Sequence, residues 1–149
     1  VRDSKLVAEK TRERLYELIL EKSTACSTGI VGHKEIDRIN ILRATLKAMK
    51  IAVEGLGKQP SLVLVDGRQL PKLTGRCEAI KGGDGQSFSI AAASIVAKVT
   101  RDRIMREKDG EYPDYGFMRN KGYGTVEHRE AIGRIGRSPL HRRSFQVKI

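Results

Sequence analysis

The stretch VLVDGRQLPKLTGRCEAIKGGDGQ, residues 63–86, decides the fold. Its start belongs to SLVLVDG, residues 61–67, whose continuous apolar run between a proline and a glycine is typical of a fully buried strand ending at Asp66. A second short strand is predicted over CEAIK, residues 77–81, followed by the turn GGDG that contains Asp84. Both predicted strands therefore lead into an aspartate.

Helical patterns flank these strands. Residues 7–22 place apolar side chains at near-helical spacing among charges and predict an exposed amphipathic helix. Residues 35–56 predict one helix with Asp37 as a possible N-cap and a stop at Gly55. Residues 87–110 begin with a serine and hold many alanines, which predicts a long helix that is buried early and charged late.

The remaining segments are shorter. TACSTGIV, residues 24–31, is rich in small and β-branched side chains and predicts a short strand. After the long helix, residues 112–125 predict a loop, residues 126–136 a short helix and residues 137–149 a basic tail. Helices that alternate with short strands indicate an α/β fold.

The composition is that of one globular domain. With 149 residues, 39% of them hydrophobic, we expect a single domain with an α/β part over residues 1–110 and a helical, basic C-terminal extension over residues 111–149. No apolar run approaches the roughly 20 residues that span a bilayer, and no signal-peptide order is present. A soluble, cytoplasmic protein without a membrane partner is expected. Cys26 and Cys77 show no metal or disulfide spacing and are expected to be buried free thiols.

The charge points to a polyanionic partner. Lysine and arginine number 29 against 18 acidic residues, which leaves a net charge of +11. Such an excess usually neutralises a polyanion, and nucleic acid is the first candidate. A solvated basic surface that serves only solubility is the alternative. Because aromatic residues make up only 5% of the chain, contact with backbone phosphates is favoured over rows of stacked bases.

The two aspartates suit a hard cation. Asp66 directly follows a predicted strand, and ligands of α/β sheets gather at strand ends. Asp84 lies among glycines, which would let a phosphate or a hydrated ion approach closely. Mg²⁺ and Mn²⁺ prefer oxygen ligands, so phosphoryl-transfer chemistry is indicated. The alternative is that both Asp-Gly pairs are ordinary turns.

A series of longer motifs runs in order through the chain. They are DSK at residues 3–5, EIDRINILRATLKAM at 35–49, LVDG at 64–67, IKGGD at 80–84, SIAAASIVAKVTRDR at 89–103, YPDYGF at 112–117, NKGYGT at 120–125 and HRRSF at 141–145. In this series the chain closely resembles bacterial ribonuclease HII, nearly from end to end. The resemblance implies an RNase H-like mixed sheet flanked by helices.

The resemblance also implies an activity. The family consists of endonucleases that hydrolyse the RNA strand of RNA/DNA hybrids and cut 5′ to ribonucleotides embedded in duplex DNA, leaving 3′-hydroxyl and 5′-phosphate ends. Four carboxylates hold its Mg²⁺ or Mn²⁺ ions for two-metal hydrolysis. The third and fourth correspond to Asp66 and Asp84, which are therefore the expected catalytic and metal-binding residues. Family members are usually monomeric.

Substrate contacts follow from the same motifs. Tyr123 corresponds to the family tyrosine that packs at the junction between the ribonucleotide and the next deoxyribonucleotide. The residues also expected to bind substrate are Lys5, which matches a phosphate contact, and Ser4, Lys121, Arg142 and Arg143. Glycines on both sides of Tyr123 would let its ring lie flat on a sugar; a packing or turn role is the alternative. RNA is distinguished from DNA at a given sugar by the 2′-hydroxyl.

Three further polar residues are expected to be structural. Asp102, in the predicted long helix, is expected to form a helix-surface or inter-helix ion pair. His128 and His141 are expected to be polar packing residues or phosphate contacts, because a two-metal mechanism requires no histidine.

One departure from the family concerns its first strand. That strand carries DEAGRG, which supplies two carboxylates and a turn that reads the 2′-hydroxyl, and this sequence contains no such motif. We expect an N-terminally incomplete member with unpaired sheet edges that needs a complementing strand. Residues 1–149 alone are expected to cleave hybrids poorly or not at all. A non-catalytic nucleic-acid-binding fragment is the alternative, and a purely structural protein is the third.

Overall fold

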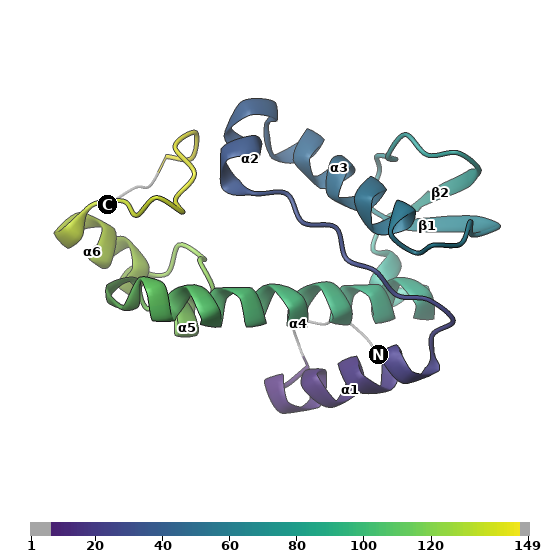
Figure 1. Ribbon diagram of the computed structural model, residues 1–149, viewed down its shortest axis with the longest axis horizontal. Coiled ribbons are helices and arrows are strands. Elements are labelled where there is room, and N and C mark those ends of the chain that lie inside the picture. Colours follow the sequence, from purple (N-terminus) through teal and green to yellow (C-terminus); the bar gives the residue numbers. More distant parts are fainter. Residues whose placement is uncertain (1–6, 147–149) are drawn as a thin grey trace.

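One long helix, α4, runs through the middle of the molecule (Figure 1). In the view of Figure 1, α1 lies on one side of α4 and α2 and α3 lie on the other, while both strands lie near the N-terminal end of α4. The computed structural model describes residues 7–146. Its elements are α1 (Glu9–Lys22), α2 (His33–Ile39), α3 (Ile41–Glu54), β1 (Leu62–Asp66), β2 (Arg76–Ile80), η1 (Gly83–Gly85), α4 (Phe88–Glu111), η2 (Pro113–Tyr115), α5 (Phe117–Asn120) and α6 (Val126–Ile135).

The long helix forms as predicted. Ser87 is its N-cap, and the Ser87 hydroxyl accepts a hydrogen bond from the backbone N–H of Ile90 at 3.5 Å. The early part of α4 supplies much of the core, with Ile90, Ala91, Ile95, Val96 and Val99 all buried. Charged side chains dominate its later part. The helix therefore connects the strand end of the molecule with its C-terminal part.

The two strands are parallel. They pair from Leu62 opposite Arg76 to Asp66 opposite Ile80. The strand predictions over residues 61–67 and 77–81 are confirmed. The fully buried character predicted for the first strand is wrong, since only Val65 of β1 is buried. A two-stranded sheet offers too few neighbours to cover both of its faces.

The segment predicted as one helix over residues 35–56 is two helices. The break falls at Asn40, whose backbone φ is 70° and whose side-chain oxygen accepts the N–H of Arg43 at 3.0 Å. Asn40 is thus the N-cap of α3, and the predicted cap, Asp37, lies inside α2. Asparagine caps helices well, which explains why α3 begins after this residue.

The strand predicted over residues 24–31 is absent; this segment has no regular secondary structure. It runs against a helix instead of beside a strand. A Cβ atom added at Gly29 would lie 1.8 Å from the backbone oxygen of Ala48 in α3. Close contact with a helix backbone leaves the segment without a ladder partner, so its β-branched residues do not form a strand.

The C-terminal part has a small core of its own. Buried Tyr115, Phe117, Ala131 and Ile132 pack together, and Leu140 of the tail packs against them. The loop predicted over residues 112–125 contains η2 and α5, and the helix predicted over residues 126–136 is confirmed as α6. The division of the domain at residue 110 stays a prediction.

Two further findings concern the surface. Cys26 is exposed and Cys77 is half-buried, so the prediction of two buried thiols is wrong. Both thiols are free. Within residues 7–146, no helix combines the length and the apolar character that a membrane crossing requires.

Candidate functional site

Asp66 lies at the end of β1, where the chain leaves the sheet. Its side chain is exposed, and its Oδ1 atom accepts the backbone N–H of Gly83 at 2.9 Å. Gly83 is buried, and an added Cβ there would lie 2.5 Å from Cδ1 of Ile90. The Asp66 carboxylate is therefore tied to a loop that is pressed against the first turn of α4.

Asp84 lies in that loop, next to Gly83. It belongs to the short 3₁₀ turn η1, which begins after Gly82 in a left-handed conformation with φ 66°. The Asp84 side chain is half-buried, and no residue in the described part of the chain donates a hydrogen bond to its carboxylate. Hydrogen bonding thus joins the loop of Asp84 to the end of the strand that carries Asp66.

The donor set of this region suits a hard cation but is small. Carboxylate oxygens are the ligands that Mg²⁺ and Mn²⁺ prefer, and one Asp66 oxygen is already held by an amide. Among residues 7–146 there is no group of three or more His, Cys, Asp or Glu side chains that could hold a metal ion. Asp66 and Asp84 can therefore supply only part of a coordination shell, with water or substrate oxygens as further ligands.

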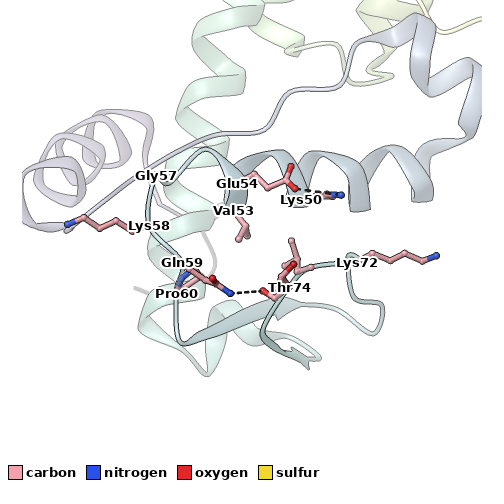
Figure 2. A pocket seen from close by; sticks show the side chains of 10 residues that line it. Lys50, Val53, Glu54, Gly57, Lys58, Gln59, Pro60, Lys72 and Thr74 are labelled. Atoms are coloured by element: carbon pink, nitrogen blue, oxygen red, sulfur yellow. Dashed lines mark hydrogen bonds and ion pairs between the residues drawn. The ribbon is translucent and has the colours of Figure 1, made fainter.

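A hollow of about 520 Å³ lies near the starts of the two strands, between the end of α3 and the segments that precede β1 and β2 (Figure 2). Three lysines line it: Lys50, Lys58 and Lys72. Their ammonium groups point in different directions in Figure 2, and that of Lys50 lies 3.6 Å from a carboxylate oxygen of Glu54. The hollow therefore gathers no convergent positive charge.

Tyr123 is presented to solvent above α4. Its side chain is 53% exposed, and its ring centroid lies 5.7 Å from Nζ of Lys98 and 5.9 Å from Cζ of Arg101. Gly122 has φ 78°, and a Cβ there would lie 3.1 Å from Cε of Met105, so glycine is needed at that position. The exposed ring of Tyr123 and the exposed Arg101 make a positively charged surface, with the half-buried Lys98 beside them.

The tail adds a third cation to this surface. Burial lowers the pKa of Arg142, and the positive charge of nearby Arg101 lowers it further. The guanidinium carbon of Arg142 also lies 3.5 Å from the ring centroid of Phe145. We call Tyr123, Lys98, Arg101 and Arg142 the Tyr123 cluster.

The other predicted substrate residues have structural contacts. The ammonium of Lys121 donates to the carbonyl of Met118 at 2.5 Å. The side chain of Arg143 is exposed, and its backbone N–H donates to Oδ2 of Asp37 at 2.8 Å. Ser4 and Lys5 lie outside the described residues.

Asp37 anchors the tail through three hydrogen bonds, which we call the tail clasp. Besides the N–H of Arg143, its carboxylate accepts the N–H of Ser144 at 3.0 Å and the Ser144 hydroxyl at 2.5 Å. The tail clasp holds the segment that carries Arg142 and Arg143 against α2. The sequence pattern indicated a helix cap for Asp37 and gave no sign of this role.

The two predicted groups of site residues lie at different positions along α4. Asp66 and Asp84 adjoin the first turn of α4. Lys98 and Arg101 lie roughly 15–20 Å further along the helix axis, at a rise of 1.5 Å per residue. Lys98 and Arg101 were not predicted as site residues. Their spacing of three positions on a predicted helix, which places both on one face, was the available signal.

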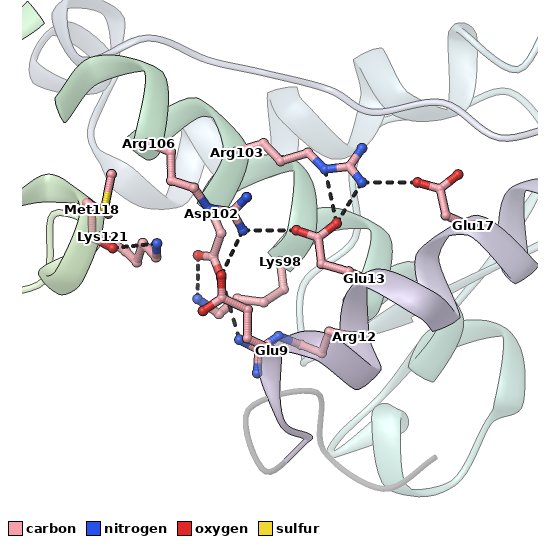
Figure 3. Close-up of polar contacts among 10 residues, drawn as sticks. All are labelled: Glu9, Arg12, Glu13, Glu17, Lys98, Asp102, Arg103, Arg106, Met118 and Lys121. Atoms are coloured by element: carbon pink, nitrogen blue, oxygen red, sulfur yellow. Dashed lines mark hydrogen bonds and ion pairs between the residues drawn. The ribbon is translucent and has the colours of Figure 1, made fainter. Parts of the chain in front are cut away.

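Asp102 forms the expected inter-helix ion pair but not at the surface. Its side chain is buried, with 2% of the residue exposed. One carboxylate oxygen lies 2.6 Å from Nζ of Lys98, and the other lies 3.6 Å from Nη2 of Arg12 in α1 (Figure 3). Asp102 thus holds Lys98 beside Tyr123 and joins α1 to α4.

The two histidines pack in the interior as polar residues. His128 is buried and His141 is half-buried, and their Nε2 atoms are 3.0 Å apart. Both rings also contact Phe117, at centroid distances of 5.5 Å and 5.9 Å. The prediction of polar packing is confirmed.

Comparison with known proteins points to one family. The family model described as ribonuclease HII matches residues 1–148. The ribonuclease HII of Acetivibrio thermocellus is 52% identical over 143 residues, which cover 96% of this chain and 56% of that protein. The ribonuclease HII of Clostridioides difficile is 50% identical over 149 residues, which cover 100% of this chain and 58% of that protein. The chain spans little more than half the length of these two relatives.

A solved structure supports the fold. The crystal structure of the ribonuclease H2 from Pyrococcus horikoshii OT3 matches with a TM-score of 0.81 and covers 97% of this chain and 76% of that chain, at 22% sequence identity. This likeness confirms the predicted RNase H-like α/β fold. Because the family model and relatives at 50–52% identity extend over almost all of the sequence, this chain belongs to the ribonuclease HII family.

Proposed function

We propose that this chain supplies two metal-binding carboxylates and a substrate surface to an endoribonuclease. The proposed enzyme hydrolyses the RNA strand of RNA/DNA hybrids and cuts 5′ to ribonucleotides embedded in duplex DNA, leaving 3′-hydroxyl and 5′-phosphate ends. The observation that carries the proposal is the hydrogen bond from Gly83 N–H to Asp66, because it ties a strand-end carboxylate to the loop that presents Asp84. Membership of the ribonuclease HII family supports the same reaction.

The residues of this chain have distinct proposed roles. Bound Mg²⁺ or Mn²⁺ ions would activate the attacking water and stabilise the leaving oxygen. Asp66 and Asp84 hold these ions, and the Gly83 amide orients the Asp66 carboxylate. Tyr123 packs on the sugar at the junction. The residues proposed to contact phosphates are Lys98, Arg101, Arg142, Arg143, Lys121 and Lys5, together with Ser4.

Removal of one negative charge tests the carboxylate assignment. In a version of the chain that carries a DEAGRG strand, Asp66→Asn and Asp84→Asn should each lower hybrid cleavage by more than about 100-fold, because even the outer-shell partners of metal ligands are worth 10–100-fold. Binding of the duplex should stay within about twofold. Cleavage is measured on a labelled duplex with one ribonucleotide, and Asp114→Asn, an exposed aspartate of η2, is the control. A near-normal rate for either variant removes that residue from the metal site.

The polypeptide of residues 1–149 is proposed to cleave weakly on its own, because it contains two of the four carboxylates that the family resemblance implies. The second candidate function is therefore duplex binding without cleavage, which the exposed cation Arg101 of the Tyr123 cluster favours. Binding and cleavage by residues 1–149, measured side by side with the DEAGRG-bearing version, separate the two. Robust metal-dependent cleavage by residues 1–149 would contradict the proposal that this polypeptide cleaves weakly on its own. The monomeric state, the complementing strand and the cytoplasmic location stay predictions.

A further inference from the structure

A continuous chain of hydrogen bonds runs from the tail to the backbone of Tyr123. The N–H of Ser138 and the Ser138 hydroxyl lie 2.9 Å and 2.8 Å from Nδ1 of His141. Nε2 of His141 lies 3.0 Å from Nε2 of His128, and Nδ1 of His128 lies 2.9 Å from the carbonyl oxygen of Tyr123. We call these three hydrogen-bonded steps the histidine relay.

The two ends of the histidine relay decide where its protons lie. A backbone N–H can only donate, so Nδ1 of His141 must be unprotonated and its proton must be on Nε2. A carbonyl can only accept, so Nδ1 of His128 must carry a proton and its Nε2 must be bare when the ring is neutral. His141 Nε2–H then donates to His128 Nε2. Every contact is satisfied only when both rings are neutral.

The surroundings favour that neutral state. Only 4% of His128 is exposed, and the His141 ring packs on Tyr115 at a centroid distance of 5.1 Å. The other ionisable groups that face the pair are Tyr115 and, from the start of the tail, the cation of Arg137. Burial lowers the pKa of His141 from its ordinary 6.5, and the neighbouring His128 and Arg137 lower it further.

We propose that His128 and His141 are positioning residues, which in their neutral tautomers hold the Tyr123 carbonyl and so fix the orientation in which Tyr123 meets a ribonucleotide. The inference rests on the proposed substrate role of Tyr123. The carbonyl has two lone pairs, and the second accepts the N–H of Thr125 at 2.8 Å. Because Tyr123 has a glycine on each side, its own segment provides little stiffness. The histidine relay supplies that stiffness from the tail.

Acid should disrupt the histidine relay. A proton added to His128 goes to Nε2 and faces the Nε2–H of His141 across the 3.0 Å gap. A proton added to His141 goes to Nδ1 and faces the N–H of Ser138. Because folding lowers the pKa of His141, the neutral ring contributes to the stability of the folded protein. This contribution is fully present above the ordinary pKa of 6.5 and decreases as the pH falls below it. Orientation of Tyr123 should be lost over the same range of pH.

The tautomers can be measured without nucleic acid. The chain has three histidines, so ¹⁵N-labelled histidine gives few NMR signals, and His33 serves as the internal reference. At neutral pH we expect the Nδ1–H tautomer for His128 and the Nε2–H tautomer for His141. The opposite tautomer on either ring, or a charged ring at pH 7, overturns the histidine relay.

Two substitutions of the same residue separate positioning from packing. In His128→Asn the amide nitrogen takes the place of Nδ1 and still donates to the Tyr123 carbonyl, whereas His128→Leu fills the space without a donor. We expect the ¹³C-tyrosine ring signals of Tyr123 to keep their wild-type positions in His128→Asn and to move in His128→Leu. A pure packing role predicts the reverse order, since leucine fills the site better than asparagine, and that order overturns the proposal.

Binding then connects the histidine relay to the substrate. The wild-type chain and His128→Asn should prefer a duplex with one ribonucleotide over an all-DNA duplex, and His128→Leu should lose most of that preference while its affinity for all-DNA duplex changes less than twofold. The Tyr123→Ala variant should lose the preference regardless of residue 128. The wild-type chain could show no preference for the ribonucleotide-containing duplex while the tautomers and tyrosine signals are as expected. That result would contradict the proposed substrate role of Tyr123 but not the histidine relay. A preference retained by His128→Leu shows that the relay does not position Tyr123.

Discussion

The carboxylate of Asp37, a half-buried residue, has an unusual acidity. Hydrogen bonds from the Ser144 hydroxyl, the Ser144 N–H and the Arg143 N–H lower its pKa from 3.8 to about 2. The charged form is thus favoured by three donors at once. These donors lie 106 and 107 positions away along the chain. A local sequence pattern carries no trace of such distant partners, which is why Asp37 was predicted as a helix cap.

The tail clasp should be lost in strong acid. Because folding lowers the pKa of Asp37, its contribution is fully present above the ordinary value of 3.8 and is lost as the pH falls through about 2. The amide proton shifts of Arg143 and Ser144 should titrate together with a midpoint near 2. NMR spectra from pH 5 downward measure this, and Asp37→Asn should abolish the titration. A midpoint near 4 would contradict the tail clasp.

At the scale of elements, the connection between α2 and α3 combines a cap with backbone strain. Asn40 has φ 70° and ψ 164°, a region that suits glycine and strains other residues. Its side chain nevertheless caps α3. The two effects oppose each other, so different substitutions should separate them.

We expect Asn40→Ala to lower the free energy of unfolding by about 1–2 kcal/mol, because alanine loses the cap and keeps the strain. Asn40→Gly loses the cap but relieves the strain, and it should be more stable than Asn40→Ala by about 1 kcal/mol or more. Urea unfolding followed by circular dichroism gives both values. Equal stability of the two variants would show that strain at this position is negligible.

The helix α1 is attached to α4 largely through charges. Arg103 contacts Glu13 at 2.6 Å and Glu17 at 3.0 Å, and Arg106 contacts Glu9 at 2.8 Å and Glu13 at 2.9 Å (Figure 3). Burial raises the pKa of Glu13, but hydrogen bonds from Arg103 and Arg106 outweigh it and lower that pKa. No residue of α1 is buried, so these pairs supply what apolar packing does not.

Glu13→Gln should destabilise the protein by about 0.5–1.5 kcal/mol at low salt, because it weakens two partly exposed ion pairs at once. The difference from the wild type should shrink as salt rises. Thermal unfolding at two salt concentrations measures it. Glu21→Gln is the matched control and should leave the unfolding temperature unchanged, since within residues 7–146 Glu21 pairs only with its neighbour Lys22. A loss that is independent of salt would indicate a packing role for Glu13.

The elements that were predicted correctly are those whose structure follows from residues close together in the sequence. The apolar run of β1 and the alanine-rich start of α4 after Ser87 each follow from neighbouring residues. The strand prediction over residues 24–31 was wrong because the structure of this segment depends on α3, which lies later in the chain. The positions of Asp66 and Asp84 at strand ends could be predicted for the same local reason. The contacts of Lys98 and Arg101 with Tyr123 could not, since they need the fold.

Considered as a whole, the molecule has a net charge of +11, and part of its positive charge is already neutralised within the fold. Arg103 and Arg106 are paired with α1, whereas Arg101 is exposed and donates a hydrogen bond to the uncharged backbone carbonyl of Lys121, at 3.2 Å. Arg142 adds a further cation near Arg101. The Tyr123 cluster is therefore the surface that we propose for binding phosphates.

Duplex binding should weaken steeply with salt. Each neutralised phosphate contributes about 0.9 to the slope of log K against log salt, so Arg101→Gln should flatten that slope by about 0.9. Fluorescence anisotropy of a labelled duplex at several salt concentrations gives the slope. Arg14→Gln, an exposed arginine of α1, is the control and should leave it unchanged. Equal flattening by both variants would mean that contacts are spread over the surface.

The tail clasp also bears on the order in which the chain is made and folded. Its donors are synthesised 106 and 107 residues after Asp37. The Asp37 carboxylate of α2 therefore lacks these donors until the tail segment has been synthesised. Contacts so far apart in sequence are slow to form because a long loop must close first. During translation, the segment carrying Arg142 should be the last part of the basic surface to reach its place.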